Sequence, residues 1–581
     1  MFDENAVSSL SGICYKKNIV VSVKYLKKIH YFCWVFTLHI MKRHTLLFAL
    51  CALALTVAAQ NTRDRKAPLE DVNKVRDLTL DSLNKANTAR PIPGSSRKGT
   101  NPVLFLVGNS TMRTGTLGNG NNGQWGWGYF AHEYFDENRI TVENHALGGT
   151  SSRTFYNRLW PAVLEGVKPG DWVIIELGHN DNGPYDHGRA RASIPGIGTD
   201  SMVVTIKETG AVETVYSYGE YMRKFIRDVR SKGAHPVLCS LTPRNSWDNE
   251  TTITRKRDTF TKWQQEIARE MDVPWIDLEG TTARKFEAYG PWKVNYMFYL
   301  DKIHTSEFGA KTNARSAAEA IAACEGLALK DYLLPLDLPM EQFVREAGKP
   351  VVFFTGDSTV KNEDKDENSM WGWASVAHTV FNTKKCTLVN AAKAGRSART
   401  FVEEGRWEKV YNSIEPGDYV LIQFGHNDMG DIAGGKARAD IRGVKDSSHV
   451  YRLEKDRTYK VVYSYGWYLR KFVGDVREKG GTPVIVSMTP RNEWPNGKME
   501  RRPGSCASWA KEVADELGVA FVDMHNLTAD YLDRKAGSKE KAAKYYKRDH
   551  THTSLLGAQL NAKMFRKGIK QTDCDLKKLM K

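Results

Sequence analysis

Short apolar runs alternate with amphipathic stretches along most of this chain, and the alternation occurs twice. The runs are of strand length and no hairpin turn signals join them, so we expect parallel strands linked by crossover helices. The pattern predicts an α/β fold built as two three-layer α/β/α sandwiches. The predicted strands are 102–107, 140–144, 171–177, 235–241 and 273–278 in the first series, and 351–355, 386–390, 418–424, 482–488 and 519–524 in the second.

The clearest crossover helix follows the third run of the first series. Its apolar residues recur at the spacing of one helix face, which predicts a stripe packed against the sheet. The stripe consists of Tyr221, Phe225, Ile226 and Val229. The basic residues between them are expected to face solvent: Arg223, Lys224, Arg227 and Arg230. The second series keeps this pattern in the segment YLRKFVGDVREKGG.

The two series repeat after about 248 residues, a period that points to two similar domains rather than to a solenoid of small repeats. A chain of 581 residues also exceeds what one hydrophobic core usually holds. The segment before the first series is charged and then rich in Pro, Gly and Ser, which indicates a helical lead-in and a linker. The predicted divisions are 61–100 for this lead-in and linker, 101–335 for the first domain, 336–347 for a linker and 348–575 for the second domain.

The N-terminal segment contains an export signal. From Met41 the chain reads MKRHTLLFALCALALTVAAQNT, in which a basic start, a short apolar run and small residues match a secretory signal peptide over 41–60. We expect Met41 to be the true start, residues 1–40 to be a mis-assigned extension, and the mature protein to be periplasmic or secreted, with no stable membrane span. The alternatives are a membrane anchor around 31–40 and a lipid attached to Cys51.

Composition narrows the function classes. The net charge is +16, and without the first 60 residues 77 Lys and Arg still face 66 Asp and Glu. A basic surface concentrates anionic polymers. An acidic polysaccharide suits an exported protein, whereas nucleic acid does not and no nucleic-acid motif is present; a basic surface with no binding role is the alternative. The five cysteines after residue 60 show no disulfide or metal spacing, so we expect mostly buried thiols and no metal.

Four short blocks recur in the same order in both series. The first series contains Gly108-Asn109-Ser110-Thr111, Gly149, Gly178-His179-Asn180-Asp181 and Asp301-Lys302-Ile303-His304. The second contains Gly356-Asp357-Ser358-Thr359, Gly395, Gly425-His426-Asn427-Asp428 and Asp549-His550-Thr551-His552. In both series 194 residues separate the serine from the last histidine. Two copies at one spacing argue against a chance match.

These blocks contain the parts of a serine hydrolase. A serine hydroxyl needs a positioned base to become a nucleophile, and an aspartate can orient that base. The candidate triads are Ser110, His304 and Asp301, and Ser358, His552 and Asp549. The candidate oxyanion donors, besides the backbone amide of each serine, are Gly149 and Asn180, and Gly395 and Asn427. Taken singly, such a serine is also a common helix cap and such an asparagine a common turn residue.

In this combination the blocks resemble the SGNH (GDSL-like) hydrolase superfamily, and the details GDSTV, FGHND and HTS are similar to its rhamnogalacturonan acetylesterase family. The resemblance covers roughly 101–330 and 348–575. It implies flavodoxin-like domains with five-stranded parallel sheets, no cofactor, and removal of O-acetyl groups from pectic rhamnogalacturonan through an acyl-serine. No G-x-S-x-G elbow surrounds either serine, which disfavours the α/β-hydrolase fold.

The first series departs from the family at one position. Asn109 stands where the family has aspartate, as the second series does at Asp357. The asparagine still accepts hydrogen bonds through its carbonyl oxygen, but it has lost the charge. We expect both sites to be active; a decayed first domain that only binds polysaccharide is the alternative.

About thirty extra residues follow the third strand of each series, and a loop of that length is commonly functional. We expect it to wall the substrate cleft. Four of its arginines are candidate contacts to substrate carboxylates, with simple solvation as the alternative: Arg189, Arg191, Arg438 and Arg442. The tryptophans of the two repeated W-G-W segments, 125–127 and 371–373, are interpreted as core residues rather than sugar platforms.

The leading hypothesis is an exported carbohydrate esterase whose partner is an acetylated acidic polysaccharide or oligosaccharide. Within enzymes, the alternative is the same chemistry on acetylated xylan, on another glycan or on lipid esters, although the polar insertions do not suit a lipid. From a different class, the alternative is a polysaccharide-binding protein with vestigial sites. The intact serine, histidine and aspartate in both series argue against it.

Overall fold

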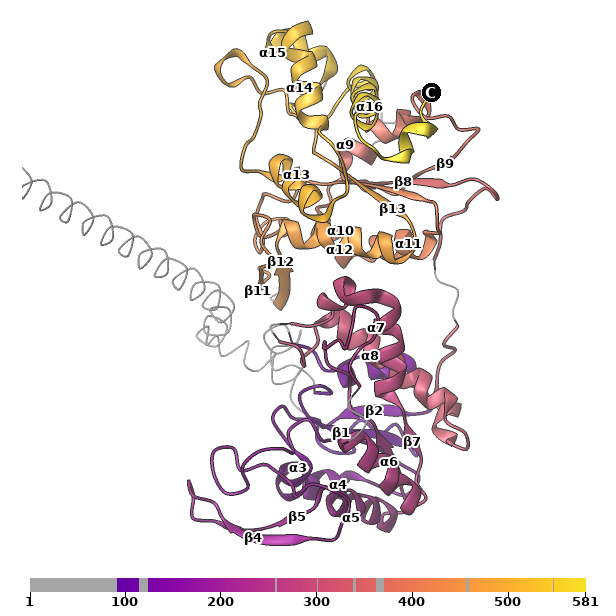
Figure 1. Cartoon of the computed structure of the whole chain (residues 1–581), viewed down its shortest axis with the longest axis vertical. Helices are drawn as coiled ribbons and strands as arrows, with labels where there is room; N and C mark the ends of the chain where they lie inside the picture. The colour runs from indigo at the N-terminus through magenta and orange to yellow at the C-terminus, as the bar shows by residue number, and fades with distance from the viewer. Residues whose placement is uncertain are drawn as a thin grey trace, which may run out of the picture. The chain divides into compact units, whose positions relative to one another are not determined.

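The computed structural model describes residues 91–113, 124–255, 259–299, 301–337, 341–361, 370–455, 459–546 and 548–581 (Figure 1). These residues form two domains of one architecture, one for each series of the sequence. The predicted signal peptide at 41–60 and the extension at 1–40 lie outside the described residues. In the part of the chain that is described, no helix is both long enough and apolar enough to cross a membrane.

The first domain contains a parallel five-stranded sheet in the order β2-β1-β3-β6-β7. Its strands are β1 (Val103–Gly108), β2 (Thr141–Asn144), β3 (Trp172–Glu176), β6 (His235–Cys239) and β7 (Trp275–Ile276). This is the flavodoxin-like order, in which ligands bind at the carboxyl ends of β1 and β3, where the strand order reverses. The predicted fold class is confirmed.

The second domain repeats this sheet in the order β14-β13-β10-β8-β9, which is the same order read from the other edge. Its strands, all parallel, are β8 (Val351–Gly356), β9 (Thr387–Asn390), β10 (Tyr419–Gln423), β13 (Thr482–Val486) and β14 (Ala520–Val522). The ends of β8 and β10 therefore correspond to those of β1 and β3.

Helices cover both faces of each sheet, because the strands are apolar on both sides. In the first domain one core lies under α3 (Ser152–Arg158), α4 (Trp160–Gly166), α5 (Tyr218–Ser231) and α6 (Phe260–Glu270). The other core lies under α8 (Glu307–Ala323) and the short helices η2 (Trp127–Tyr129), η3 (Ala131–Tyr134) and η4 (Ala328–Tyr332), and α7 (Leu278–Asn295) packs along α8.

The second domain has the same layers. One face carries α10 (Ala398–Glu403), α11 (Arg406–Ser413), α12 (Tyr465–Glu478) and α13 (Cys506–Leu517). The other carries η5 (Trp373–Thr379), α16 (Leu555–Ile569) and η8 (Asp575–Leu579). The remaining elements are α9 (Ser358–Lys361), η6 (Pro495–Gly497), α14 (Met524–Lys535), α15 (Lys539–Ala542) and η7 (Ala543–Tyr545).

Helix α5 confirms the predicted stripe, since all four of its apolar residues are fully buried. The prediction that Arg223 faces solvent is wrong. Its guanidinium donates to the carboxylate of Glu270 on α6 and to the carbonyl oxygen of Ile197 in the insertion. These two neighbours cover a flank of the helix that the helical period alone leaves exposed.

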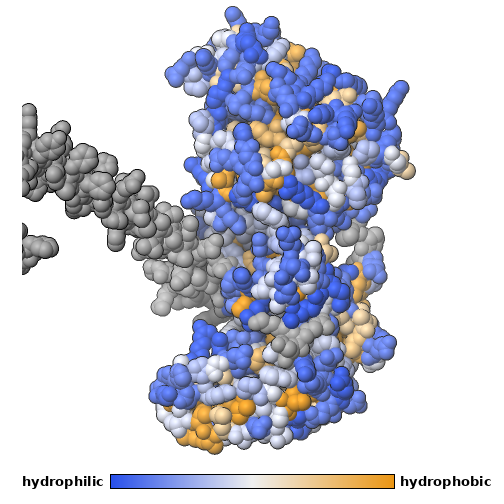
Figure 2. Space-filling view, in the orientation of Figure 1, coloured by the Kyte–Doolittle hydropathy of each residue, from blue (hydrophilic) through white to orange (hydrophobic). Residues whose placement is uncertain are grey.

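Each insertion contains an antiparallel hairpin, so the segment predicted as a loop has secondary structure of its own. The hairpins are β4 (Ser201–Thr205) with β5 (Val212–Tyr216), and β11 (Ser448–Arg452) with β12 (Tyr459–Tyr463). Apolar side chains of Met202, Val203 and Val212 are exposed on the first hairpin, and Figure 2 shows apolar surface at this end of the first domain. The β-branched residues on both sides of a Lys-Glu-Thr-Gly turn were the overlooked signal.

Residues beyond the predicted domain limits also pack on the domains. The guanidinium of Arg97 pairs with Asp171 at 2.6 Å, and that of Arg345 pairs with Asp418 at 2.8 Å. Leu576 and Met580 are buried in the second domain. Each compact unit therefore extends past the residues that carry its motifs. The five cysteines of the described residues are free, and Cys239, Cys386 and Cys506 are buried, as predicted.

Candidate active site

The first triad is assembled at the carboxyl end of β1. Nε2 of His304 lies 2.9 Å from the Ser110 hydroxyl oxygen, and Nδ1 lies 2.6 Å from Oδ2 of Asp301. The other oxygen of Asp301 accepts hydrogen bonds from the backbone N–H groups of Ile303 and His304. Burial raises the pKa of Asp301, but these hydrogen bonds outweigh it and the net pKa is lowered. The aspartate is thus held ionised beside the histidine.

The second triad repeats this geometry. Nε2 of His552 lies 2.8 Å from the Ser358 hydroxyl oxygen, and Nδ1 lies 2.7 Å from Oδ2 of Asp549. Burial raises the pKa of Asp549, but the hydrogen bonds from His552 and Thr551 have a larger opposite effect, and the net pKa is lowered to about 2. All six residues predicted for the two triads therefore meet as the sequence blocks suggested.

A short turn holds each serine at the end of its strand. Oδ1 of Asn109 accepts from the backbone N–H of Thr111 at 3.1 Å, and Oδ1 of Asp357 accepts from that of Thr359 at 2.8 Å. The turn spans the serine and directs its hydroxyl toward the histidine. An amide oxygen can make this contact as well as a carboxylate can, so the Asn109 departure leaves the turn intact.

The loop that carries each predicted oxyanion glycine is bonded to the strand end before the serine, since the N–H of Leu147 donates to the carbonyl oxygen of Gly108 and that of Lys393 to the carbonyl oxygen of Gly356. Gly149 (φ 84°) and Gly395 (φ 77°) have the left-handed backbone that favours glycine. Among the described residues, nothing accepts a hydrogen bond from the backbone N–H groups of Ser110 and Gly149, or from those of Ser358 and Gly395. These groups are free to bind a developing negative charge.

Each asparagine of the third block is tied to the glycine loop. Nδ2 of Asn180 donates to the carbonyl oxygen of Thr150 at 2.9 Å, and Nδ2 of Asn427 donates to that of Arg396 at 3.0 Å. An amide nitrogen carries two hydrogens, so one remains for a substrate oxygen. The oxyanion role of both residues stays a prediction.

Two of the predicted substrate arginines brace the same loop. Nη1 of Arg191 donates to the carbonyl oxygen of Gly149, and Nη1 of Arg438 to that of Gly395, both at 3.0 Å. Arg189 and Arg442 are exposed, and Arg442 donates to the carbonyl oxygen of Met429 at 3.3 Å. In the structure, Arg191 and Arg438 therefore contact and support the glycine loop, and their role as substrate contacts stays a prediction.

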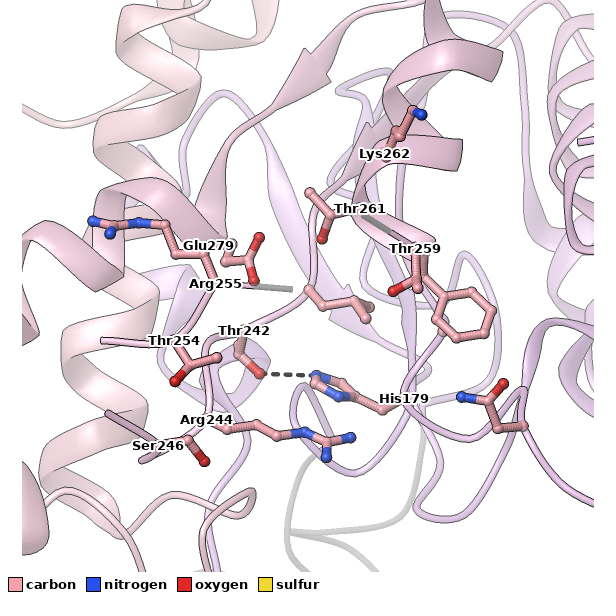
Figure 3. A pocket seen from close by; sticks show the side chains of 14 residues that line it. His179, Thr242, Arg244, Ser246, Thr254, Arg255, Thr259, Thr261, Lys262 and Glu279 are labelled. Carbon is pink, nitrogen blue, oxygen red and sulfur yellow. Dashed lines mark hydrogen bonds between the residues drawn. The ribbon is translucent and has the colours of Figure 1, made fainter. Parts of the chain in front are cut away.

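A hollow of about 800 Å³ in the first domain is lined by Gly178 and His179 of the third block and by Arg244 (Figure 3). It lies next to the catalytic loop, because the backbone N–H of Asn245 donates to the carbonyl oxygen of Lys302. Cationic side chains of Arg244, Arg255 and Lys262 line it. Arg255 pairs with Glu287 outside the hollow. No described residue pairs with the guanidinium of Arg244.

The sequence predictions missed Arg244 and its counterpart Arg491. Both follow the fourth sheet strand in the segment TPRN, which occurs in each series. That repetition was the available signal. In the second copy the backbone N–H of Arg491 donates to Glu500, and Arg502 pairs with both Glu500 and Glu493. The second site is therefore richer in carboxylates.

Two buried polar residues at the ends of β3 and β10 were also missed. Glu176 accepts hydrogen bonds from the hydroxyl of Thr111 and the indole N–H of Trp127, both at 3.0 Å. Gln423 accepts from the indole N–H of Trp373 at 2.8 Å. Both indoles are buried, which confirms the interpretation of these two tryptophans as core residues.

Sequence comparison agrees with this geometry. The profile of the GDSL-like lipase/acylhydrolase family matches residues 106–311 and 354–560, together more than half of the chain. The chain belongs to this family. Each matched range contains one complete set of serine, aspartate and histidine, so the GDSL-like domain is present in two tandem copies.

Individual relatives each match about one copy of the GDSL-like domain. The chain is 30% identical over 241 residues to a rhamnogalacturonan acetylesterase of Emericella nidulans, which covers 41% of this chain and 92% of that protein. It is 31% identical over 243 residues to the rhamnogalacturonan acetylesterase RhgT of Bacillus subtilis, covering 39% and 94%. A crystal structure of the Bacillus subtilis protein YxiM aligns at 26% identity with a TM-score of 0.32, covering 39% of this chain and 58% of that one.

Proposed function

We propose that the protein is an exported carbohydrate acetylesterase that removes O-acetyl groups from pectic rhamnogalacturonan by a Ser-His-Asp mechanism. The observation that carries the proposal is the pair of assembled triads, each beside unoccupied backbone donors. The relatives named rhamnogalacturonan acetylesterases support the substrate class. The signal peptide predicted over 41–60 supports export.

The chemistry follows from the contacts. His304 or His552 takes the serine proton as the oxygen attacks the acetyl carbonyl, and the paired aspartate stabilises the resulting imidazolium. The backbone N–H groups of the serine and the glycine, with the asparagine amide, hold the developing oxyanion. The histidine then returns its proton to the leaving sugar hydroxyl. Water then attacks the acetyl-serine while the histidine takes its proton. The histidine returns that proton to the serine oxygen, and acetate is released.

The hollow of the first copy supports an acidic polymer as substrate. A guanidinium without a protein partner binds a carboxylate favourably, and Arg244 lies beside the catalytic loop. A pectic backbone carries uronate carboxylates at regular intervals. Acetylated xylan, the alternative substrate, offers fewer charged groups to this arginine.

The test is acetate release from acetylated rhamnogalacturonan and from acetylated xylan. The wild type is compared with Ser110→Ala, Ser358→Ala and the double variant. We expect faster release from rhamnogalacturonan, partial loss in each single variant and complete loss in the double. Equal rates on both polymers would reject the pectic assignment, and an active double variant would reject the mechanism.

Export is tested separately. The chain is expressed from Met41, and the N-terminus of the protein recovered from the periplasm or the medium is sequenced. Cleavage near Ala59 is expected; an intact N-terminus on cytoplasmic protein would reject export while leaving the esterase proposal standing.

A further inference from the structure

A buried acid changes position between the two copies. In the second copy the acid is Asp357, directly before the serine, and the adjacent strand end carries the amide Gln423. In the first copy the residue before the serine is the amide Asn109, and the strand end carries the acid Glu176. All four side chains are buried. Each copy thus has one acid and one amide at this pair of positions, in opposite order.

A threonine hydroxyl connects the two positions in each copy. In the second copy Nε2 of Gln423 lies 3.3 Å from the Thr359 hydroxyl oxygen, and that hydroxyl donates to Oδ1 of Asp357 at 2.8 Å. In the first copy the Thr111 hydroxyl lies 3.0 Å from both Oε1 of Glu176 and Oδ1 of Asn109. A hydroxyl has one hydrogen, and a carboxylate is the stronger acceptor. The hydrogen-bond chain therefore ends on Asp357 in one copy and on Glu176 in the other.

The remaining contacts fit the exchange. The tryptophan that donates to Gln423 has a counterpart that donates to Glu176, and the backbone N–H of Thr242 adds a third donor to that carboxylate at 3.2 Å. In contrast, Nδ2 of Asn109 is buried and has no hydrogen-bond partner among the described residues. In the first copy the acceptor at the end of the hydrogen-bond chain is therefore residue 176, whereas in the second copy it is Asp357, the counterpart of residue 109.

A buried negative charge near the triad favours the imidazolium that forms when the histidine takes the serine proton. In the second copy the charge of Asp357 and the charge of His552 attract each other. In the first copy Asn109 offers no such charge. Glu176 reaches the serine turn through a single hydroxyl group, that of Thr111.

We propose that Glu176 is the positioning residue that supplies, in the first copy, the buried negative charge that Asp357 supplies in the second. The pair Asn109 and Glu176 is then an exchanged version of the pair Asp357 and Gln423 of the second copy and not a sign of decay. The proposal rests on the Ser-His-Asp mechanism proposed above. It goes beyond that mechanism by adding a residue outside both triads.

The charge of Glu176 depends on pH close to neutrality. Burial raises the pKa of Glu176 to about 7, against the lowering effect of its hydrogen bonds from Trp127 and Thr111. The titratable groups that face it are His179, 3.8 Å away, Tyr218 on α5 and Cys239 on β6. Burial raises the pKa of Tyr218 and of Cys239, so both stay neutral. The carboxylate forms as the pH rises through about 7.

The first half of the test uses the full chain with Ser358→Ala, so that 4-nitrophenyl acetate reports the first site alone. Glu176→Gln, which leaves no acid, should lower kcat about tenfold at unchanged KM. Asn109→Asp, which buries two acids around one hydroxyl, should lower both kcat and Tm. The double variant Asn109→Asp with Glu176→Gln should recover kcat to within about threefold, with the pH profile of the second site.

The second half mirrors this in the other copy, with Ser110→Ala as background. Asp357→Asn should lose activity, and Asp357→Asn with Gln423→Glu should regain most of it. An unchanged kcat in Glu176→Gln would overturn the proposal. It would also be overturned if each double variant kept the Tm of the wild type but had a kcat no higher than that of its less active single variant. So would an absence of hydrolysis dependent on Ser110. Because the ester is not a polysaccharide, a wrong pectic assignment would leave these results untouched.

Discussion

The two copies differ little at the reacting atoms and much in the charges around them. The serine to histidine distances are 2.9 and 2.8 Å, and the histidine to aspartate distances are 2.6 and 2.7 Å. The corresponding positions that differ in charge include Asn109 and Asp357, Glu176 and Gln423, Ser193 and Asp440, Ser246 and Glu493, Thr254 and Glu500, and Glu279 and His525. Backbone turns shared by both copies hold the reacting geometry. The surrounding charges can therefore diverge wherever each buried acid keeps its donors.

The largest expected effect concerns what the copies share. Asn180→Ala and Asn427→Ala, each measured with the other copy's serine replaced by alanine, should lower kcat about a hundredfold or more, because each removes one predicted oxyanion donor. KM should change little. A loss in only one copy would mean that the two sites stabilise the oxyanion differently, and Tm checks that both variants fold.

The second prediction concerns the charged positions beside the triads. Arg244→Ala should raise KM for acetylated rhamnogalacturonan about tenfold, the usual scale for a lost charge-assisted hydrogen bond. Arg491→Ala should raise it less, since Glu493 and Glu500 already supply carboxylates there. Hydrolysis of 4-nitrophenyl acetate is the matched control, because this ester has no carboxylate. Equal effects on both substrates would contradict a role in binding acidic sugars.

Ser246→Glu combined with Thr254→Glu sharpens the same comparison. The structural equivalence is direct: the N–H of Thr254 donates to the carbonyl oxygen of Ser246, and the N–H of Glu500 donates to that of Glu493. The variant gives the first copy the carboxylates of the second. It should raise KM for the acidic polymer several-fold and make that KM strongly dependent on salt. If the variant has the KM of the wild type at low salt, these two positions do not affect the binding of the charged substrate.

A smaller effect is expected from the bracing arginines. Arg191→Gln and Arg438→Gln each remove one hydrogen bond to the glycine loop, with a net value of about 1 kcal/mol. Both should lower kcat a few-fold on neutral and acidic substrates alike. A rise in KM confined to the acidic polymer would instead restore their predicted role as substrate contacts.

The smallest effect concerns stability and its pH dependence. Asp428 and Asp440 are buried together, and burial raises the pKa of Asp428 to about 7 and the pKa of Asp440 as well. The corresponding pair in the first copy is Asp181 and Ser193, with one acid. A carboxyl whose folded pKa lies above its unfolded value stabilises the fold less and less as the pH rises from the unfolded to the folded pKa, and the loss is complete above the folded pKa. Asp440→Ser should therefore raise Tm by a few °C at pH 8 and by less at pH 5. An equal shift at both pH values would exclude titration as the cause.

The fold and both triads could be predicted because their signals are local. Each strand is a short apolar run, and each reacting residue lies in a block of four residues that occurs twice. The distance of 194 residues between Ser110 and His304 is bridged by the parallel sheet, which brings the carboxyl ends of its strands to one edge. In these segments the tertiary structure agrees with what the local patterns predict.

The missed features depend on packing between distant elements. Glu176 and Gln423 end apolar strand runs, so they look like strand residues until the tryptophans and threonines around them are placed. The burial of Arg223 depends on α6 and on the insertion. The loop contacts of Arg191 and Arg438 were not predicted either, and their role as substrate contacts stays a prediction. In each case the deciding partner lies far away in sequence.

The order of the reacting residues along the chain bears on biosynthesis. Ser110 follows the first strand of its domain, whereas His304 precedes α8, the last long helix of that domain. A ribosome has therefore made nearly the whole first domain before that triad can close, and it has not yet begun β8. Domains generally fold as units, the N-terminal one first. Ester cleavage during translation of the chain without residues 1–60 would thus report the maturation of each half in turn.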